Sequence, residues 1–170
     1  MEEACESACR IAELPEGSVV CYCDGGADGN GANGVHGAVG WGTSSLRKTA
    51  GGLELIDELW GQVEMNEHSD WYCGAERANN NTAELTGIIE SIAMLKAVGG
   101  YDNCAIAYDS EYAAHAAQGR RGKTNHKLID TAQRLLKEER ERRVAAAEAA
   151  GETEKPTIQF VHVFAHTGQV

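Results

Sequence analysis

The segment from Thr82 to Gln118 constrains the fold more than any other, because two helical patterns flank a short strand there. Apolar residues first recur at helical spacing, and the glycine pair Gly99–Gly100 predicts the end of that helix. The apolar run Ala105–Tyr108 then predicts a strand, and Ser110–Gln118 predicts a second helix. If another strand precedes the first helix, the two strands form a parallel pair with a right-handed crossover. The sequence therefore predicts an α/β fold.

The first half of the chain predicts antiparallel hairpins. Ser18–Cys23 is a β-rich apolar run that stops at an aspartate, and a glycine-rich stretch leads from there into a second predicted strand at His36–Thr43. Leu53–Val63 and Trp71–Gly74 are predicted as further strand pieces, and the acidic residues between them are predicted as a surface loop. These pieces give the sheet its antiparallel part.

The last third of the chain predicts one long helix and one strand. The helix begins at Asn125 with a single apolar stripe, and its charged, alanine-rich end at Lys137–Ala150 is predicted to project into solvent. Thr157–Phe164 alternates apolar and polar residues as a strand does. Together the elements predict a mixed sheet, with antiparallel hairpins plus parallel strands, flanked by helices.

Length and composition narrow the class of protein. A chain of 170 residues fits one domain, and it contains no run of 18 apolar residues that would predict a membrane span. Residues Met1–Gly17 lack the basic start and apolar core of a signal peptide, so we expect an intracellular location, in cytoplasm or nucleus. The six cysteines form no CxxC pair, which favours reduced, structural thiols.

The net charge of −11 is unusual for a protein that binds nucleic acid, because such proteins usually have a basic surface. Much of the acid lies in Met1–Glu16 and Glu54–Glu76, whereas Arg120, Arg121 and Lys123 fall close together. These basic residues predict a small patch that contacts phosphates, and a solvated loop is the alternative.

Three carboxylates are candidates for a metal site. Asp24 and Asp109 each follow an apolar strand, so in a parallel pair both would emerge at the same edge of the sheet. Glu84 lies near the start of the predicted helix and can approach that edge. Hard oxygen ligands in one cleft favour Mg²⁺, with Mn²⁺ as a substitute, and two such ions can clamp a phosphodiester for hydrolysis. Each residue alone has a structural alternative as a turn former, a helix-dipole partner or a residue beside a helix cap.

The order of four motifs resembles that of type 1 ribonuclease H. The motifs are DGG at Asp24, NNNTAEL around Glu84, YDSEYA around Asp109 and HVFAHTG around His166, and the resemblance spans Val19–Gly168. It implies a metal-dependent endoribonuclease that hydrolyses the RNA strand of RNA/DNA hybrids. It also implies that the three carboxylates bind two metal ions, and that His166 assists proton handling or product release as a catalytic residue.

The same resemblance implies contacts with the hybrid. Asn80 and Asn81 would lie in its minor groove, where an amide can both donate to and accept from a 2′-hydroxyl. Gly25 and Ser110, which follow two of the carboxylates, are predicted to contact nucleic acid as well. The alternative for the asparagine run is that it caps the helix at Thr82. Of the other histidines, the one within the last predicted strand, His162, is expected to be structural.

The sequence also departs from the family pattern. The family carries a fourth carboxylate on a final helix, about ten residues past the histidine, and this sequence includes neither. We therefore expect an acidic N-terminal extension at 1–17 and a ribonuclease H-like domain at 18–170 that lacks its C-terminal helix. The uncovered sheet predicts a protein partner or low stability. The alternative function is a catalytically weak or inactive module that binds nucleic acid or protein.

Overall fold

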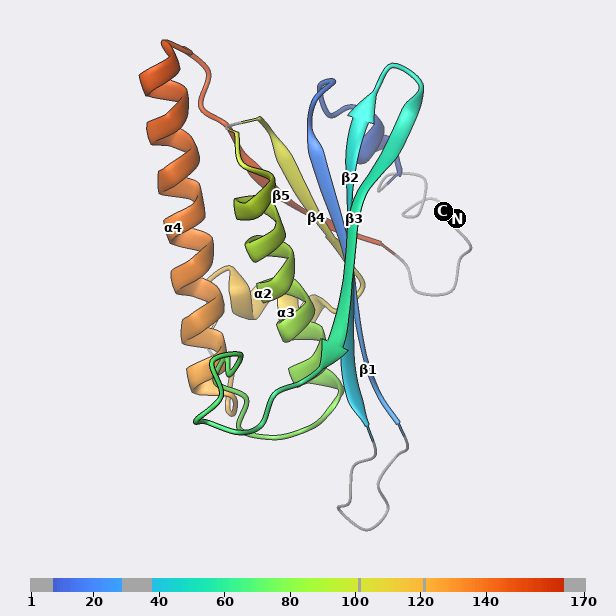
Figure 1. The fold of residues 1–170 in the computed structure, drawn as a ribbon, viewed down its shortest axis with the longest axis vertical. Coiled ribbons are helices and arrows are strands. Elements are labelled where there is room, and N and C mark those ends of the chain that lie inside the picture. Colours follow the sequence, from blue (N-terminus) through green and yellow to red (C-terminus); the bar gives the residue numbers. More distant parts are fainter. Residues whose placement is uncertain (1–7, 29–37, 101, 121, 164–170) are drawn as a thin grey trace.

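The computed structural model describes residues 8–28, 38–100, 102–120 and 122–163. Its centre is a five-stranded sheet in the order β3-β2-β1-β4-β5 (Figure 1). β1, β2 and β3 pair antiparallel, while β4 pairs parallel with β1 and β5 parallel with β4. The predicted mixed sheet is therefore confirmed. The strands are β1 Val19–Ala27, β2 Val39–Thr49, β3 Gly52–Gln62, β4 Cys104–Tyr108 and β5 Ile158–His162.

Three helices lie on one side of the sheet (Figure 1). They are α2 Asn80–Val98, α3 Glu111–Ala117 and α4 His126–Ala150. The larger hydrophobic core fills the space between them and the sheet, where Leu85 and Ile88 of α2 and Leu128 of α4 pack with Cys21 and Ile106 of the central strands. Within the described residues, none of the helices combines the length and apolar character needed to span a bilayer.

A segment before β1 covers part of the opposite face of the sheet. Residues 8–12 are helical. Ile11 and Leu14 are buried in a second cluster with Val20 of β1, Ala107 of β4 and Val161 of β5. Figure 1 places this segment on the far side of the sheet from α2 and α4. The described part of the predicted N-terminal extension therefore packs as part of the domain.

Three strand predictions are wrong. β1 continues through Asp24 to Ala27 instead of stopping at Cys23. β2 continues to Thr49 instead of ending at Thr43, because its antiparallel pairing with β3 runs on to Thr49 opposite Gly52, with one register shift between Ser45 and Leu46. Trp71–Gly74 forms turns and irregular backbone instead of a strand. At Gly74, a Cβ atom would lie 2.7 Å from the backbone of Lys127, so this loop packs closely on the start of α4.

The prediction that the end of α4 projects into solvent is also wrong. Glu139 and Arg143 are only 2% and 1% exposed. Arg143 donates to the Glu139 carboxylate at 2.8 Å and to the backbone oxygens of Asp102 and Leu95 at 2.7 and 3.0 Å. Burial by itself would raise the pKa of Glu139, but hydrogen bonds from Arg142 and the charge of Arg143 outweigh it and lower that pKa. This buried ion pair joins α4 to the end of α2.

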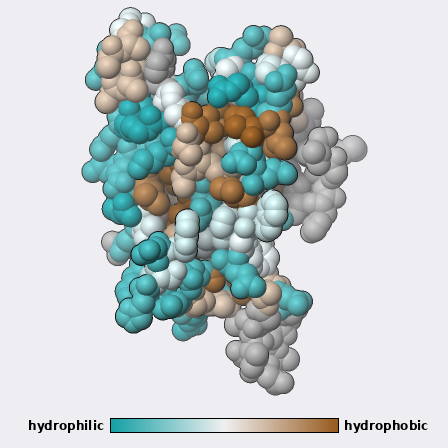
Figure 2. All heavy atoms as spheres, in the orientation of Figure 1, coloured by the Kyte–Doolittle hydropathy of each residue, from teal (hydrophilic) through white to brown (hydrophobic). Residues whose placement is uncertain are grey.

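β3 is an exposed edge strand. Every residue from Gly52 to Trp60 is exposed, and large apolar side chains are among them. Figure 2 shows apolar side chains along the upper half of this strand, among hydrophilic ones. In the described part of the chain, the exposed large apolar residues all lie on β3 and the following loop: Leu53, Leu55, Ile56, Leu59, Trp60, Met65 and Trp71.

Candidate active site

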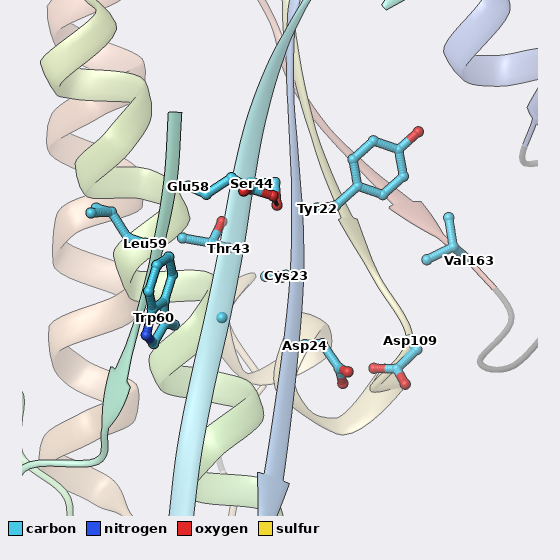
Figure 3. A pocket seen from close by; sticks show the side chains of 11 residues that line it. Tyr22, Cys23, Asp24, Thr43, Ser44, Glu58, Leu59, Trp60, Asp109 and Val163 are labelled. Atoms are coloured by element: carbon cyan, nitrogen blue, oxygen red, sulfur yellow. Dashed lines mark hydrogen bonds between the residues drawn. The ribbon is translucent and has the colours of Figure 1, made fainter. Parts of the chain in front are cut away.

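The fold brings the three predicted carboxylates together. One oxygen from each of Asp24, Glu84 and Asp109 lies within 4.8 Å of the others. Parallel pairing of β1 with β4 runs to Tyr22 opposite Ala107, so Asp24 and Asp109 follow two residues later on neighbouring strands. Figure 3 shows their side chains pointing toward one another. Among the described residues this is the single group of acidic, histidine or cysteine ligands that could hold a metal ion.

Gly25 allows Glu84 to reach this cluster. A Cβ atom at Gly25 would lie 2.2 Å from the backbone nitrogen of Glu84 and 2.4 Å from the carbonyl carbon of Ala83. Real Cβ atoms essentially never approach backbone that closely, so only glycine permits α2 to begin against β1. The structure therefore gives Gly25 a role in positioning Glu84, which the sequence interpretation had missed.

The electrostatics of the cluster fit a divalent cation. Glu84 is 6% exposed. Burial, followed by the negative charges of Asp109 and Asp24, raises the pKa of Glu84 from 4.5 to about 8. The Oδ1 atom of Asp109 is buried and has no hydrogen-bond partner among the described residues. Close carboxylates and an unpaired buried oxygen are stabilised by a hard cation such as Mg²⁺ or Mn²⁺.

The three asparagines at the start of α2 have different roles. The side chain of Asn79, the first of the three, accepts a hydrogen bond from the backbone of Thr82 at 3.0 Å and caps α2. Asn80 and Asn81 are exposed, and the Asn80 amide donates to Glu84 at 3.4 Å. The capping alternative therefore applies to Asn79 alone. Asn80 and Asn81, the two residues predicted to contact the hybrid, are not the helix cap.

Ser110 and His162 flank Asp109. The Ser110 hydroxyl accepts from the backbone of Ala113 at 3.3 Å and caps α3. The His162 ring donates from Nε2 to the carbonyl oxygen of Asp109 at 3.1 Å and stacks on Tyr108, with ring centroids 5.5 Å apart. Both side chains hold the backbone around the carboxylate. His166 lies outside the described residues.

A groove runs from the carboxylates across the sheet. It has a volume of about 580 Å³, and Tyr22, Ser44, Glu58 and Trp60 line it together with Asp24 and Asp109 (Figure 3). Tyr22, Ser44, Glu58 and Trp60 were not predicted from the sequence as site residues. Alternation along β1 could have found Tyr22, since residues two apart on a strand share a face.

The predicted basic residues lie at another cavity. Arg120 and Lys123 line a space of about 440 Å³ with Tyr112 and His115 of α3. The Arg120 guanidinium lies 3.4 Å from Nδ1 of His115. Arg121 lies outside the described residues. The structure thus places two of the three predicted basic residues side by side at the end of α3.

The mixed sheet and its carboxylate cluster define an α/β domain of the ribonuclease H type. The chain belongs to the RNase H family, whose model matches residues 16–170. A search of curated proteins finds no match.

Solved structures agree on the fold. RNase H1 from the halophilic archaeon Halobacterium salinarum is 19% identical, with a TM-score of 0.52 and 89% of each chain covered. LC11-RNase H1, a compost metagenome protein solved in complex with an RNA/DNA hybrid, is 18% identical, with a TM-score of 0.55 and 89% of each chain covered. The RNase H domain of prototype foamy virus is 14% identical, with a TM-score of 0.55, covering 91% of this chain and 83% of that domain.

Proposed function

We propose that this protein is a metal-dependent endoribonuclease that hydrolyses the RNA strand of RNA/DNA hybrids. The observation that carries the proposal is the meeting of Asp24, Glu84 and Asp109 within 4.8 Å in a chain of the RNase H family. Support comes from LC11-RNase H1, which has the same fold and was solved with an RNA/DNA hybrid.

The three carboxylates would hold the ions, and Mg²⁺ fits their hard oxygen ligands. Such ions, when bound, supply activation of the attacking water and stabilisation of the leaving oxygen. Gly25 fixes the start of α2 against β1, and this keeps Glu84 in the cluster. His162 holds the Asp109 carbonyl at 3.1 Å, which orients the strand end that carries the third carboxylate.

Recognition of the RNA strand would rest on Asn80 and Asn81. Both are exposed at the start of α2, and Asn80 also contacts Glu84, so a 2′-hydroxyl bound there would lie beside the carboxylates. Arg120 and Lys123 would bind phosphates of the duplex. We also propose that His166 assists proton handling and that Arg121 contacts a phosphate.

The test is hydrolysis of a hybrid labelled on its RNA strand, in Mg²⁺ and separately in Mn²⁺. We expect cleavage of the RNA strand, and we expect Asp109→Asn to reduce the rate by at least about 10²-fold, in the range seen when one electrostatic stabiliser is removed. Asp70→Asn, an exposed carboxylate outside the cluster, is the matched control and should cleave normally. Cleavage that Asp109→Asn leaves unchanged would contradict the proposed site.

A second candidate function is favoured by the net charge of −11. Such a charge weakens attraction to phosphates, as in a catalytically weak module that binds nucleic acid or protein. Hybrid binding without turnover in either metal would select this second candidate.

A further inference from the structure

A cavity of about 430 Å³ lies between β3, α2 and the loop that follows β3. All three tryptophans of the chain line it: Trp41, Trp60 and Trp71. Trp41 is held against Gly61, where a Cβ atom would lie 3.2 Å from the indole ring. Trp60 and Trp71 are 78% and 80% exposed, so their rings remain accessible to a ligand. We call this space the tryptophan cavity.

The charged groups of the tryptophan cavity are acidic. Glu64 and Glu90 line it. Burial raises the pKa of Glu90, and the described residues provide no hydrogen bond or ion pair to its carboxylate. Glu64 accepts a hydrogen bond from the backbone of Asn66 at 2.7 Å, which lowers its pKa and keeps it ionised. A half-buried carboxylate without a donor is stabilised when a cation enters beside it.

Aromatic rings and carboxylates together select for an organic cation. A guanidinium or ammonium group is attracted to the face of an aromatic ring, and tryptophan is the strongest such partner. The same carboxylates repel phosphates, which disfavours a nucleic-acid strand in this cavity.

The neighbouring edge strand points to a polypeptide as the carrier of that cation. β3 is the terminal strand of the sheet, so its outer edge is open to pairing with another strand. Leu55 and Ile56 are exposed on it and would be buried by such a strand. A second copy of this chain is a poor match, because Asp57 and Glu58 of each β3 would face like charges.

We propose that β3 and the tryptophan cavity together bind a basic polypeptide segment, with one arginine or lysine side chain inserted among the three indoles. The segment would add to the open edge of β3. Glu90 would then pair with the inserted cation.

Intrinsic fluorescence tests this directly, because every tryptophan of the chain lines the cavity. The probe is a short blocked peptide that contains one arginine between apolar β-forming residues, and the control peptide replaces arginine with citrulline, its neutral isostere. We expect a saturable fluorescence change with the arginine peptide and binding at least about tenfold weaker with the citrulline peptide. Equal binding of the two peptides, or no binding of either, would overturn the proposal.

Two variants locate the binding. Glu90→Gln should weaken arginine-peptide binding about tenfold, and Trp71→Leu should weaken it while leaving the fold intact, since Trp71 is exposed. Glu67→Gln is the matched control, because this exposed carboxylate does not line the cavity. Equal effects of Glu90→Gln and Glu67→Gln would contradict the assigned pocket. A larger response to a single-stranded oligonucleotide than to the arginine peptide, if Trp71→Leu also removes it, would assign the cavity to nucleic acid instead, because Trp71 does not line the groove beside the carboxylates. None of these measurements depends on ribonuclease activity.

Discussion

Gly25→Ala should separate α2 from β1 and spoil the carboxylate cluster. The added methyl group would lie 2.2 Å from the Glu84 nitrogen, and the atoms in its way belong to the backbone, so a side-chain rotation cannot relieve the clash. To reach an ordinary contact of 3.4 Å, the start of α2 must move by about 1.2 Å. Glu84 must move with it.

The expected cost has two parts. Overpacking of this kind destabilises proteins by about 1–3 kcal/mol, so the free energy of unfolding should fall by that amount. A shift of about 1 Å in a catalytic group can reduce activity about 10²-fold, so hybrid cleavage should fall by about that factor. The two effects have one cause and should appear together.

The assay is urea denaturation together with the rate of hybrid cleavage. Gly26→Ala is the matched control, because a Cβ atom at Gly26 has nothing within 4 Å. It should change the free energy of unfolding by less than about 0.5 kcal/mol. If Gly25→Ala behaves like Gly26→Ala in both measurements, the close approach of α2 to β1 is not what positions Glu84.

Three other features of the structure should affect stability. Arg143→Met should cost at least about 2 kcal/mol in urea denaturation, because the buried backbone oxygens of Asp102 and Leu95 lose their donor while Arg142 still pairs with Glu139; Arg134→Met, in an exposed pair, should cost less than about 1 kcal/mol. Leu14→Ala should cost about 2–4 kcal/mol, and a neutral result would contradict the packing of residues 8–17 on the sheet. With metal removed by a chelator, the pKa of Glu84 is raised in the folded state, so the folded protein keeps a proton that the unfolded chain releases above about pH 4.5. The stability that this group contributes therefore falls as the pH rises from about 4.5 toward 8. Thermal melting should show that fall, Glu84→Gln should lack it, and saturating Mg²⁺ should reverse it.

Much of the fold could be predicted from local patterns. The apolar spacing of α2 and the short run of β4 are strong signals, and a strand that ends in Asp109 beside a strand that carries Asp24 follows from the parallel pairing rule. The sequence could therefore predict the carboxylate cluster before any geometry was known.

The remaining features depend on contacts between distant parts of the chain. Three identical asparagines give no signal for which one caps the helix, and tertiary packing selects Asn79. Glu139 and Arg143 resemble solvated residues in the sequence, because the backbone oxygens that bind Arg143 come from elsewhere in the fold. The tryptophan cavity depends on the register of β2 and β3 and on the loop after β3, which no local pattern encodes.

We propose above that Asp24, Glu84 and Asp109 hold divalent metal. A crystal grown with Mn²⁺ tests it most directly, because anomalous scattering locates the ion independently of any activity. We expect an anomalous peak within about 2.0–2.4 Å of oxygens from these three side chains, and loss of that peak in Asp109→Asn. Absence of anomalous density at the cluster in saturating Mn²⁺ would contradict a metal site there.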